Sequence, residues 1–197
     1  MIGVLPEALN INGTYYPIRT DYRNILRVFE AFEDSELLCE EKWIVSIYMI
    51  FEDFFCADDV LNATQNGFDL DEAIKKILWF ISAGQPEKEN IELPVYSWKQ
   101  DQQMIFSPIN KVAGKETREL EYLHWWTFLG YFNEIGEGTF SFVVGIRDKL
   151  NKKKKLEKNE KKFINNNKAL VILKKRESKE ELEQKKQYNA LMDRMLT

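Results

Sequence analysis

Apolar residues recur at helical spacing through most of the chain, and the first clear stripe follows Thr20. Its members are Tyr22, Ile25, Leu26, Phe29 and Phe32. Residues three and four apart share one face of a helix, so this spacing predicts an amphipathic helix. Thr20 is its predicted N-cap, with Asp21 in the first turn. Residues 37–55 are apolar on more than one face, which predicts a long, largely buried helix capped by Ser35.

Two further helices are indicated by the residues at their ends. Asp69 is a capping residue at the start of an apolar stripe, and Gly84 is placed to close that helix in the left-handed conformation. A second helix is expected to begin near Ser97 and to be disturbed at Pro108, because proline lacks the amide hydrogen that a helix interior uses.

The most aromatic stretch of the chain, LEYLHWWTFLGYF at residues 120–132, has the same helical pattern. Its buried stripe is predicted to comprise Trp125, Phe128, Leu129 and Phe132, which follow the helical repeat. Thr117 is its predicted N-cap, and the sequence GEGT at residues 136–139 is expected to end it. Another helix is predicted from Thr139 to Leu150.

The period of the pattern changes from helical to alternating in ALNINGTYYPI, residues 8–18. Apolar residues alternate with asparagines before the dipeptide Asn12-Gly13, and tyrosines follow it. Asn-Gly tolerates the positive φ angles of a type I′ turn, so this segment predicts a β-hairpin. Pro17 favours an edge strand, because proline cannot donate to a sheet ladder.

These elements predict a mainly α fold: a helical domain with an N-terminal β-hairpin and a basic helical C-terminal extension. The predicted helical body spans residues 1–150. Residues 151–197 are predicted to form a lysine-rich extension that is helical or partly disordered. Its leucines are too irregular for the sustained heptads of a coiled coil.

The charge of the chain divides along the same line. Residues 149–197 contain 16 Lys and Arg against 7 Asp and Glu, whereas residues 1–148 contain 12 against 25. An acidic body therefore carries a basic tail, an asymmetry that favours an electrostatic partner. The alternative is a solvated basic helix that folds back on the body.

His124, the only histidine, is the natural candidate for chemistry, but its surroundings argue against it. Catalysis or metal binding needs a second polar group within reach, and its immediate neighbours are Leu123, Trp125 and Trp126. Neither Glu119 nor any other acid forms an i, i+4 ligand pair with it. We therefore expect a packing histidine that bonds a backbone carbonyl or a carboxylate.

The remaining polar motifs do not define a catalytic, metal or cofactor site. The acidic runs CADD (residues 56–59) and DLDE (residues 69–72) do not fit a calcium loop, so helix capping explains them better. GEGT lacks the lysine of a phosphate-binding loop. No GxSxG motif and no Cys/His couple is present. The chain is expected not to be an enzyme and to need no cofactor or metal.

Targeting signals are equally scarce. The N-terminus lacks the basic segment and apolar run of a signal peptide, and no stretch reaches the roughly 18 apolar residues of a membrane helix. Cys39 and Cys56 have no metal or redox spacing, and their apolar surroundings predict buried free thiols. The chain is expected to act in a reducing cytoplasm, without contact to a membrane.

Three blocks of the sequence resemble a small protein family of tailed bacteriophages and prophages of Gram-positive bacteria. The first block is LPEALNINGTYYPIRTDYRNIL at residues 5–26, and the second is VYSWKQD at residues 95–101. The third is LHWWTF at residues 123–128, followed by GTFSFVVGIRDK at residues 138–149. Their order and rough spacing agree with the family, so the likeness spans about residues 5–150.

The resemblance implies a non-enzymatic tail assembly chaperone, acting in the cytoplasm of the bacterial host. Its gene would lie between those for the tail tube and the tape measure. Such chaperones coat the long helical tape-measure protein and keep it soluble while tube subunits polymerise around it. The family carries no catalytic residues, so none is transferred to this chain. The partners implied are the tape-measure protein and further copies of the chain or a second chaperone.

Four rings are hypothetical partner contacts: Trp126 and Tyr131 on the aromatic helix, and Tyr15 and Tyr16 on the hairpin. The hairpin could also pair between copies by strand addition. Two other hypotheses stay open. One is a structural tail or connector completion protein of the virion. The other is a nucleic-acid-binding regulator acting through the lysine tail, which could contact phosphates but has little means of reading bases.

Overall fold

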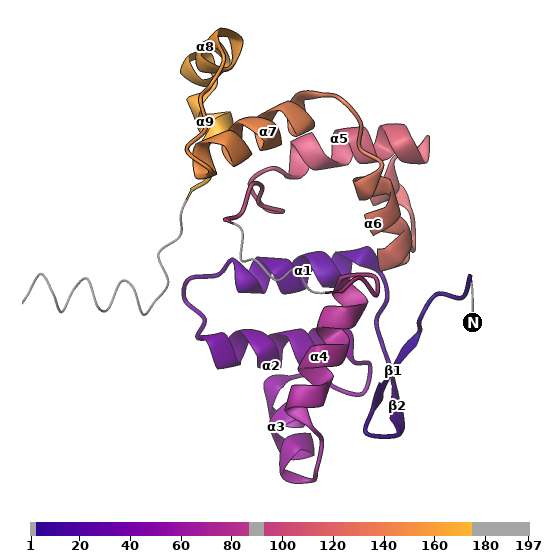
Figure 1. The fold of residues 1–197 in the computed structure, drawn as a ribbon. Helices are drawn as coiled ribbons and strands as arrows, with labels where there is room; N and C mark the ends of the chain where they lie inside the picture. Colours follow the sequence, from indigo (N-terminus) through magenta and orange to yellow (C-terminus); the bar gives the residue numbers. More distant parts are fainter. Residues whose placement is uncertain (1–2, 87–92, 175–197) are drawn as a thin grey trace, which may run out of the picture. The chain divides into compact units, whose positions relative to one another are not determined.

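A computed structural model describes residues 3–86 and 93–174, which fall into two compact units. The N-terminal unit comprises residues 6–19 and 24–78, and the C-terminal unit comprises residues 3–5, 20–23, 79–86 and 93–174. The described residues are mainly helical and begin with a two-stranded antiparallel hairpin, as predicted (Figure 1). Among them, no helix is both long enough and apolar enough to cross a membrane.

The hairpin of the N-terminal unit consists of β1 (Ala8–Ile11) and β2 (Thr14–Pro17). Asn12 and Gly13 have φ angles of 49° and 92°, which confirms the predicted turn with two positive φ values. The Asn12 side-chain amide donates to the Asp69 carboxylate over 2.8 Å and so ties the turn to the start of a helix. The Ile18 amide donates to the Glu7 carbonyl over 2.9 Å, so the adjacent pair Ala8 and Pro17 is a non-hydrogen-bonded pair, and the missing N–H of Pro17 removes nothing from the ladder.

Four helices follow the hairpin: α1 (Tyr22–Phe32), α2 (Cys39–Ile50), α3 (Ala57–Gln65) and α4 (Leu70–Ile81). The predicted caps Thr20 and Ser35 are both wrong. Asp21 precedes α1 and accepts from the Arg23 amide over 2.9 Å, because its carboxylate reaches the second helical amide. Leu38 precedes α2, and the Glu41 side chain accepts from its amide.

The long helix predicted over residues 37–55 is shorter, because α2 ends at Ile50. Phe51 is extended and forms an antiparallel bridge with Ile18. The Arg19 guanidinium donates to four carbonyls at this end, those of Tyr48, Phe51, Glu52 and Phe54. A long-range arginine thus supplies the donors that a continuing helix would have supplied, which local spacing could not reveal.

Helix α3 was not predicted, although its capping residue was interpreted correctly. The Asp59 carboxylate accepts from the amides of Phe55 and Cys56, and these bonds lower the pKa of Asp59 below its usual value. The prediction of buried thiols is wrong. Cys39 and Cys56 are both exposed, because each stands where the chain enters a helix at the surface.

The C-terminal unit contains α5 (Gln102–Ala113), the 3-10 helix η1 (Thr117–Glu119), α6 (Trp125–Asn133), α7 (Thr139–Asn151), α8 (Lys158–Asn166) and α9 (Lys168–Val171). Helix α5 begins five residues after Ser97 and continues through Pro108. Its buried residues Ile105, Phe106 and Ile109 hold it across the missing hydrogen bond. Thr117 lies in η1 and does not cap α6, whereas the helix predicted from Thr139 is confirmed.

A buried ion pair lies at the centre of this unit. The Arg147 guanidinium on α7 donates to both Asp101 carboxylate oxygens, over 2.6 and 3.0 Å, and the two side chains are 4% and 1% exposed. It also donates to the carbonyls of Val95, Leu170 and Val171, over 2.7 to 3.0 Å. All five N–H groups therefore have an acceptor. One side chain connects α7, the start of α5, the segment before it, and α9.

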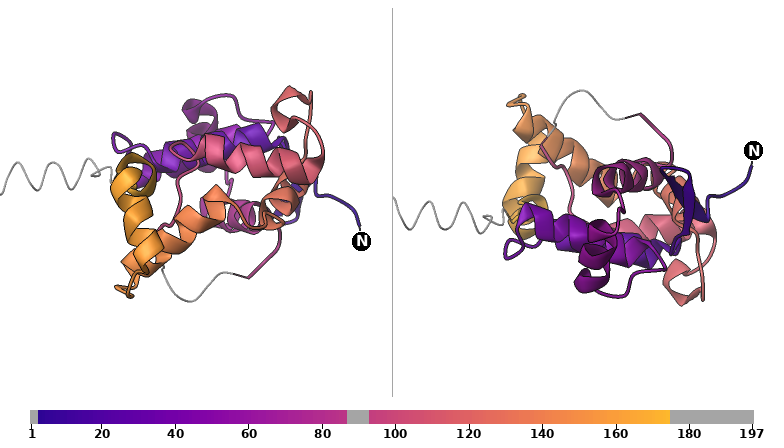
Figure 2. Two further views of the ribbon diagram at one scale, coloured as in Figure 1. Left: turned by 90° about the horizontal axis from the view of Figure 1, so that it is seen from above. Right: turned by 90° about the horizontal axis from the view of Figure 1, so that it is seen from below.

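The first part of the predicted extension is held by the same contacts. Helix α9 contacts α7 and α8 (Figure 2). The Gln100 side chain donates to the Ile172 carbonyl over 2.8 Å and accepts from the Lys174 amide over 3.0 Å. The chain is thereby fixed up to Lys174. The rest of the predicted extension, residues 175–197, lies outside the described residues.

We expect Arg147→Met to lower the free energy of unfolding by about 3–5 kcal/mol, because it leaves the Asp101 carboxylate buried without its partner. The double variant Asp101→Leu/Arg147→Met should lose less than the sum of the single variants. Urea denaturation measures both, and hydrogen exchange of residues 158–171 should rise in Arg147→Met. The control is Arg118→Met, which breaks the exposed pair with Glu116 and should have a much smaller effect. Additive losses would show that the pair is not coupled.

Candidate interaction surfaces

His124 is the cap of a helix rather than part of its interior. It stands immediately before α6, is 3% exposed, and its Nδ1 accepts from the Trp126 amide over 3.0 Å. Its ring lies edge-on to Phe80, with centroids 5.9 Å apart. The structure adds a role that the packing prediction did not include. The imidazole nitrogen accepts from a backbone amide that the first helical turn leaves unpaired.

The two tryptophans after His124 bind the end of another helix. The Trp125 indole N–H donates to the Ile81 carbonyl over 2.9 Å, and the Trp126 indole N–H donates to the Phe80 carbonyl over 2.8 Å. Both acceptors lie in the last turn of α4, where carbonyls lack helical partners. The run His-Trp-Trp thus caps the start of α6 and the end of α4 together.

A second polar group fixes the loop before α6. The Asp21 carboxylate accepts from the Leu123 amide over 3.0 Å and pairs with Arg23 over 2.9 Å. The Arg23 guanidinium also donates to the carbonyls of Arg118, Leu120 and Glu121. Tyr22, between them, stacks on Phe128 with ring centroids 4.3 Å apart. The Asp21 and Arg23 side chains therefore bind backbone groups of the loop before α6.

The described residues contain no group of three or more His, Cys, Asp and Glu side chains that could hold a metal ion. The two acidic runs singled out in the sequence serve as caps. Asp59 caps α3, and Asp69 accepts from the Glu72 amide at the start of α4 over 3.0 Å. Their carboxylates thus have backbone partners, and their pKa values are lowered chiefly by those bonds.

The four rings predicted as partner contacts are divided between the two units. Tyr15 and Tyr16 are on β2 in the N-terminal unit, and Trp126 and Tyr131 are on α6 in the C-terminal unit. Tyr15 is 72% exposed, whereas Tyr16 is half-buried and packs edge-on against Phe51 and Phe68 at 5.9 and 5.3 Å. Tyr131 is also half-buried. Of the four, Tyr15 offers the largest exposed fraction to a partner.

Trp126 joins a small cluster of rings in the C-terminal unit. Its centroid lies 5.4 Å from that of Trp79, which is 42% exposed, and 6.3 Å from that of Phe80. Because its indole also bonds the Phe80 carbonyl, Trp126 contributes to the fold whatever else it contacts. Alanine at this position would therefore confuse lost binding with lost stability.

A family model described as "Bacteriophage Gp15 protein" matches residues 1–173. The chain belongs to this bacteriophage Gp15 family. The match takes in nearly all the described residues of both units and ends one residue before the last of them. Neither a curated protein nor a solved structure matches the chain.

The sequence blocks that suggested a phage family correspond to the internal contacts of this Gp15 protein. Asp21 and Arg23 belong to the first block, Asp101 ends the second, and Arg147 belongs to the last. The motifs alone did not assign roles to these four charged residues. The available signal was a charged residue next to the apolar positions of a helix, as Arg147 is beside Val143 and Ile146.

We expect His124→Asn to be more stable than His124→Leu by about 1 kcal/mol, because asparagine retains a side-chain acceptor for the Trp126 amide and leucine does not. Both variants lose the imidazole ring, so its contact with Phe80 is absent from the comparison. Thermal and urea unfolding would measure the difference. Equal stabilities would indicate that the imidazole contributes only by filling space.

Proposed function

We propose that this Gp15 protein is a tail assembly chaperone that binds the tape-measure protein during tail morphogenesis. It would act without catalysis in the cytoplasm of a Gram-positive bacterial host. Membership of a bacteriophage family supports the setting, and the likeness of residues 5–150 to proteins encoded beside the tape measure supports the role. The tape measure is a long helical protein whose apolar stripe would self-associate unless another protein covers it.

The observation that carries the proposal is the exposure of Tyr15. The hairpin holds this ring at 72% exposure, while its neighbour Tyr16 faces the packed rings of Phe51 and Phe68. A strand places alternate residues on opposite faces, so β2 anchors itself through one tyrosine and presents the other. An amphipathic ring on a rigid element is suited to contact an apolar helix face with little loss of conformational entropy.

Weak single contacts are sufficient for such a chaperone. Many copies would bind along one tape measure, so the affinities of individual contacts would combine through avidity. Each copy could also be displaced singly as tube subunits arrive. A shallow site with one exposed ring suits this requirement better than a deep pocket, which would release its ligand slowly.

Co-expression tests the proposal. The wild-type protein should raise the yield of soluble tape-measure protein from the same phage and co-purify with it. Tyr15→Ser should reduce the co-purified amount about fivefold, the factor for a contact of roughly 1 kcal/mol. Val112→Ser, which removes a 39%-exposed side chain from α5, is the matched control and should change little.

The outcomes separate the contact from the role. An unchanged yield with Tyr15→Ser would exclude this ring as a contact, and no effect of the wild-type protein would exclude the chaperone role. Purified virions provide a second check, since a chaperone should be absent from them and a structural tail protein present. Tyr16→Ala should instead destabilise the N-terminal unit, because it removes a ring that packs on Phe51 and Phe68.

A further inference from the structure

A strongly basic surface covers the end of α7, the turn after it, and α8. Residues 148–174 contain 10 lysines, no arginine and 3 carboxylates. Nine lysines of this segment are exposed, and the six between residues 153 and 162 form what we call the lysine surface. They are Lys153, Lys154, Lys155, Lys158, Lys161 and Lys162.

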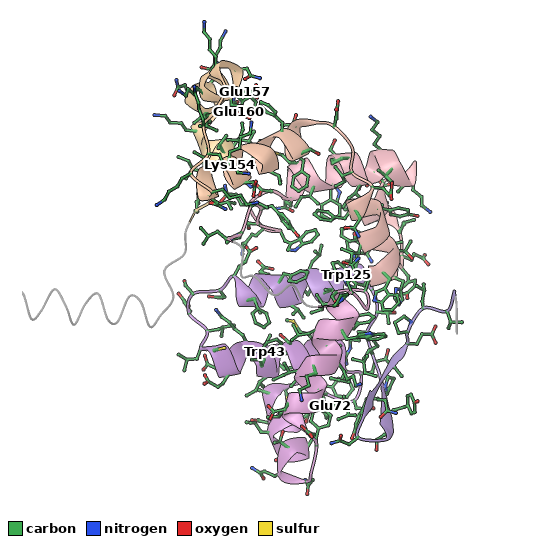
Figure 3. The ribbon with its side chains drawn as sticks, viewed as in Figure 1. Trp43, Glu72, Trp125, Lys154, Glu157 and Glu160 are labelled. Carbon is green, nitrogen blue, oxygen red and sulfur yellow. The ribbon has the colours of Figure 1, made fainter. Side chains whose placement is uncertain are left out.

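The carboxylates of the segment are occupied by other lysines. Asp148 pairs with Lys152 over 2.6 Å, and Glu160 pairs with Lys149 over 2.6 Å. Glu157 lies 3.7 Å from Lys149. Figure 3 shows Glu157 at the start of α8 and Glu160 on it, with Lys154 just after the end of α7. Glu157 and Glu160 therefore hold the start of α8 against α7, and all three acids pair with lysines outside the lysine surface.

The backbone beneath the lysine surface is fixed by specific contacts. Lys153 has a φ angle of 52°, and the Lys154 amide donates to the Lys149 carbonyl over 2.8 Å, closing the end of α7. The Phe163 ring on α8 meets Phe142 on α7 edge-on, with centroids 5.1 Å apart. Like charges are thus held together on an ordered element, which favours an anionic partner over solvation alone.

The composition of the surface favours an acidic protein over a nucleic acid. All six exposed cations are lysines, whereas the arginine of α7, Arg147, is buried in its pair with Asp101. Phe163 is packed against Phe142 and offers no stacking platform. Base reading and single-strand binding rely on guanidinium forks and exposed rings, and this surface has neither.

The chain itself supplies a complementary surface. Residues 6–19 and 24–78, the N-terminal unit, contain 14 Asp and Glu against 5 Lys and Arg. Within this unit Glu52, Asp53 and Asp58 are exposed around Phe55, whose side chain is 78% exposed. Lysine matches both features, because its ammonium pairs with carboxylates and its apolar stem and charge interact with an aromatic face.

We propose that the lysine surface of one copy binds the acidic segment around Phe55, residues 52–58, in a second copy. The contact is heterologous, because two different surfaces meet. One copy keeps a free acidic segment and the other keeps a free lysine surface, so a third copy can add. The inference concerns contacts between copies and does not rest on the proposed function. No tape-measure protein is needed to test it.

Charge reversal of the full chain tests the contact by sedimentation velocity. The wild type should associate at low salt and dissociate as salt is raised, because exposed charges are screened. Lys158→Glu/Lys162→Glu and, separately, Glu52→Lys/Asp53→Lys should each weaken self-association about tenfold or more. Mixing the two variants should restore association, since the reversed lysine surface of one then meets the reversed acidic segment of the other.

The matched control is Lys111→Glu/Lys115→Glu, which makes the same change in net charge on exposed lysines at the end of α5 and just after it. It should leave association unchanged, and circular dichroism should show every variant folded. A wild type that stays monomeric would overturn the proposal. So would equal weakening by the control, or failure of the mixed variants to associate. Lysine reversal that abolishes DNA retention while association is intact would instead assign the surface to nucleic acid.

Discussion

Burying Arg147 is possible only because each of its five N–H groups has an acceptor, and the C-terminal unit is arranged around that requirement. Asp101 supplies two of the acceptors, and backbone carbonyls from segments before α5 and in α9 supply the others. These carbonyls are far apart in sequence. A single charge therefore determines where the chain must run over more than 70 residues, and each segment depends on the others for its partner.

The same principle operates at smaller scale elsewhere in the molecule. Arg19 binds the carbonyls that follow α2, Arg23 binds the loop before α6, and two indoles bind the end of α4. Short helices have a large fraction of unpaired backbone groups, and long-range donors satisfy them. This use of tryptophan and arginine explains how a chain rich in aromatic residues can use many of its rings to complete its own fold. Many of its aromatic side chains bind backbone groups at helix ends or pack in the core.

The predictable part of the fold was the part that local spacing determines. The hairpin follows from the conformational freedom of Asn12-Gly13, and α1, α4 and α7 follow from their apolar stripes. The errors share one cause. Helix α2 ends early because the Arg19 guanidinium binds the carbonyls at its end. Helix α6 begins at Trp125 because the His124 side chain caps it. In both places a side-chain contact ends or starts a helix against the apolar pattern. Such contacts have no periodic signature.

The interaction surfaces were less accessible from the sequence for the same reason. The spacing identified the aromatic rings but not which of them would be buried. Tyr15 and Tyr16 were therefore equally good candidates for a partner contact, although only Tyr15 is largely exposed. Phe55 was assigned to a buried helix, yet it is 78% exposed because α2 ends before it. The charge asymmetry, by contrast, can be counted from the sequence alone.

What the structure adds to that asymmetry is its division between units. Most of the acidic excess belongs to the N-terminal unit, while the described lysines beyond residue 148 are built into the C-terminal unit through Arg147 and Lys149. A disordered basic tail would neutralise the nearest acid in its own chain at small entropic cost. An ordered one can select a surface by shape as well as by charge. Fixing the tail up to Lys174 therefore turns a general electrostatic attraction into a contact that can have a defined geometry.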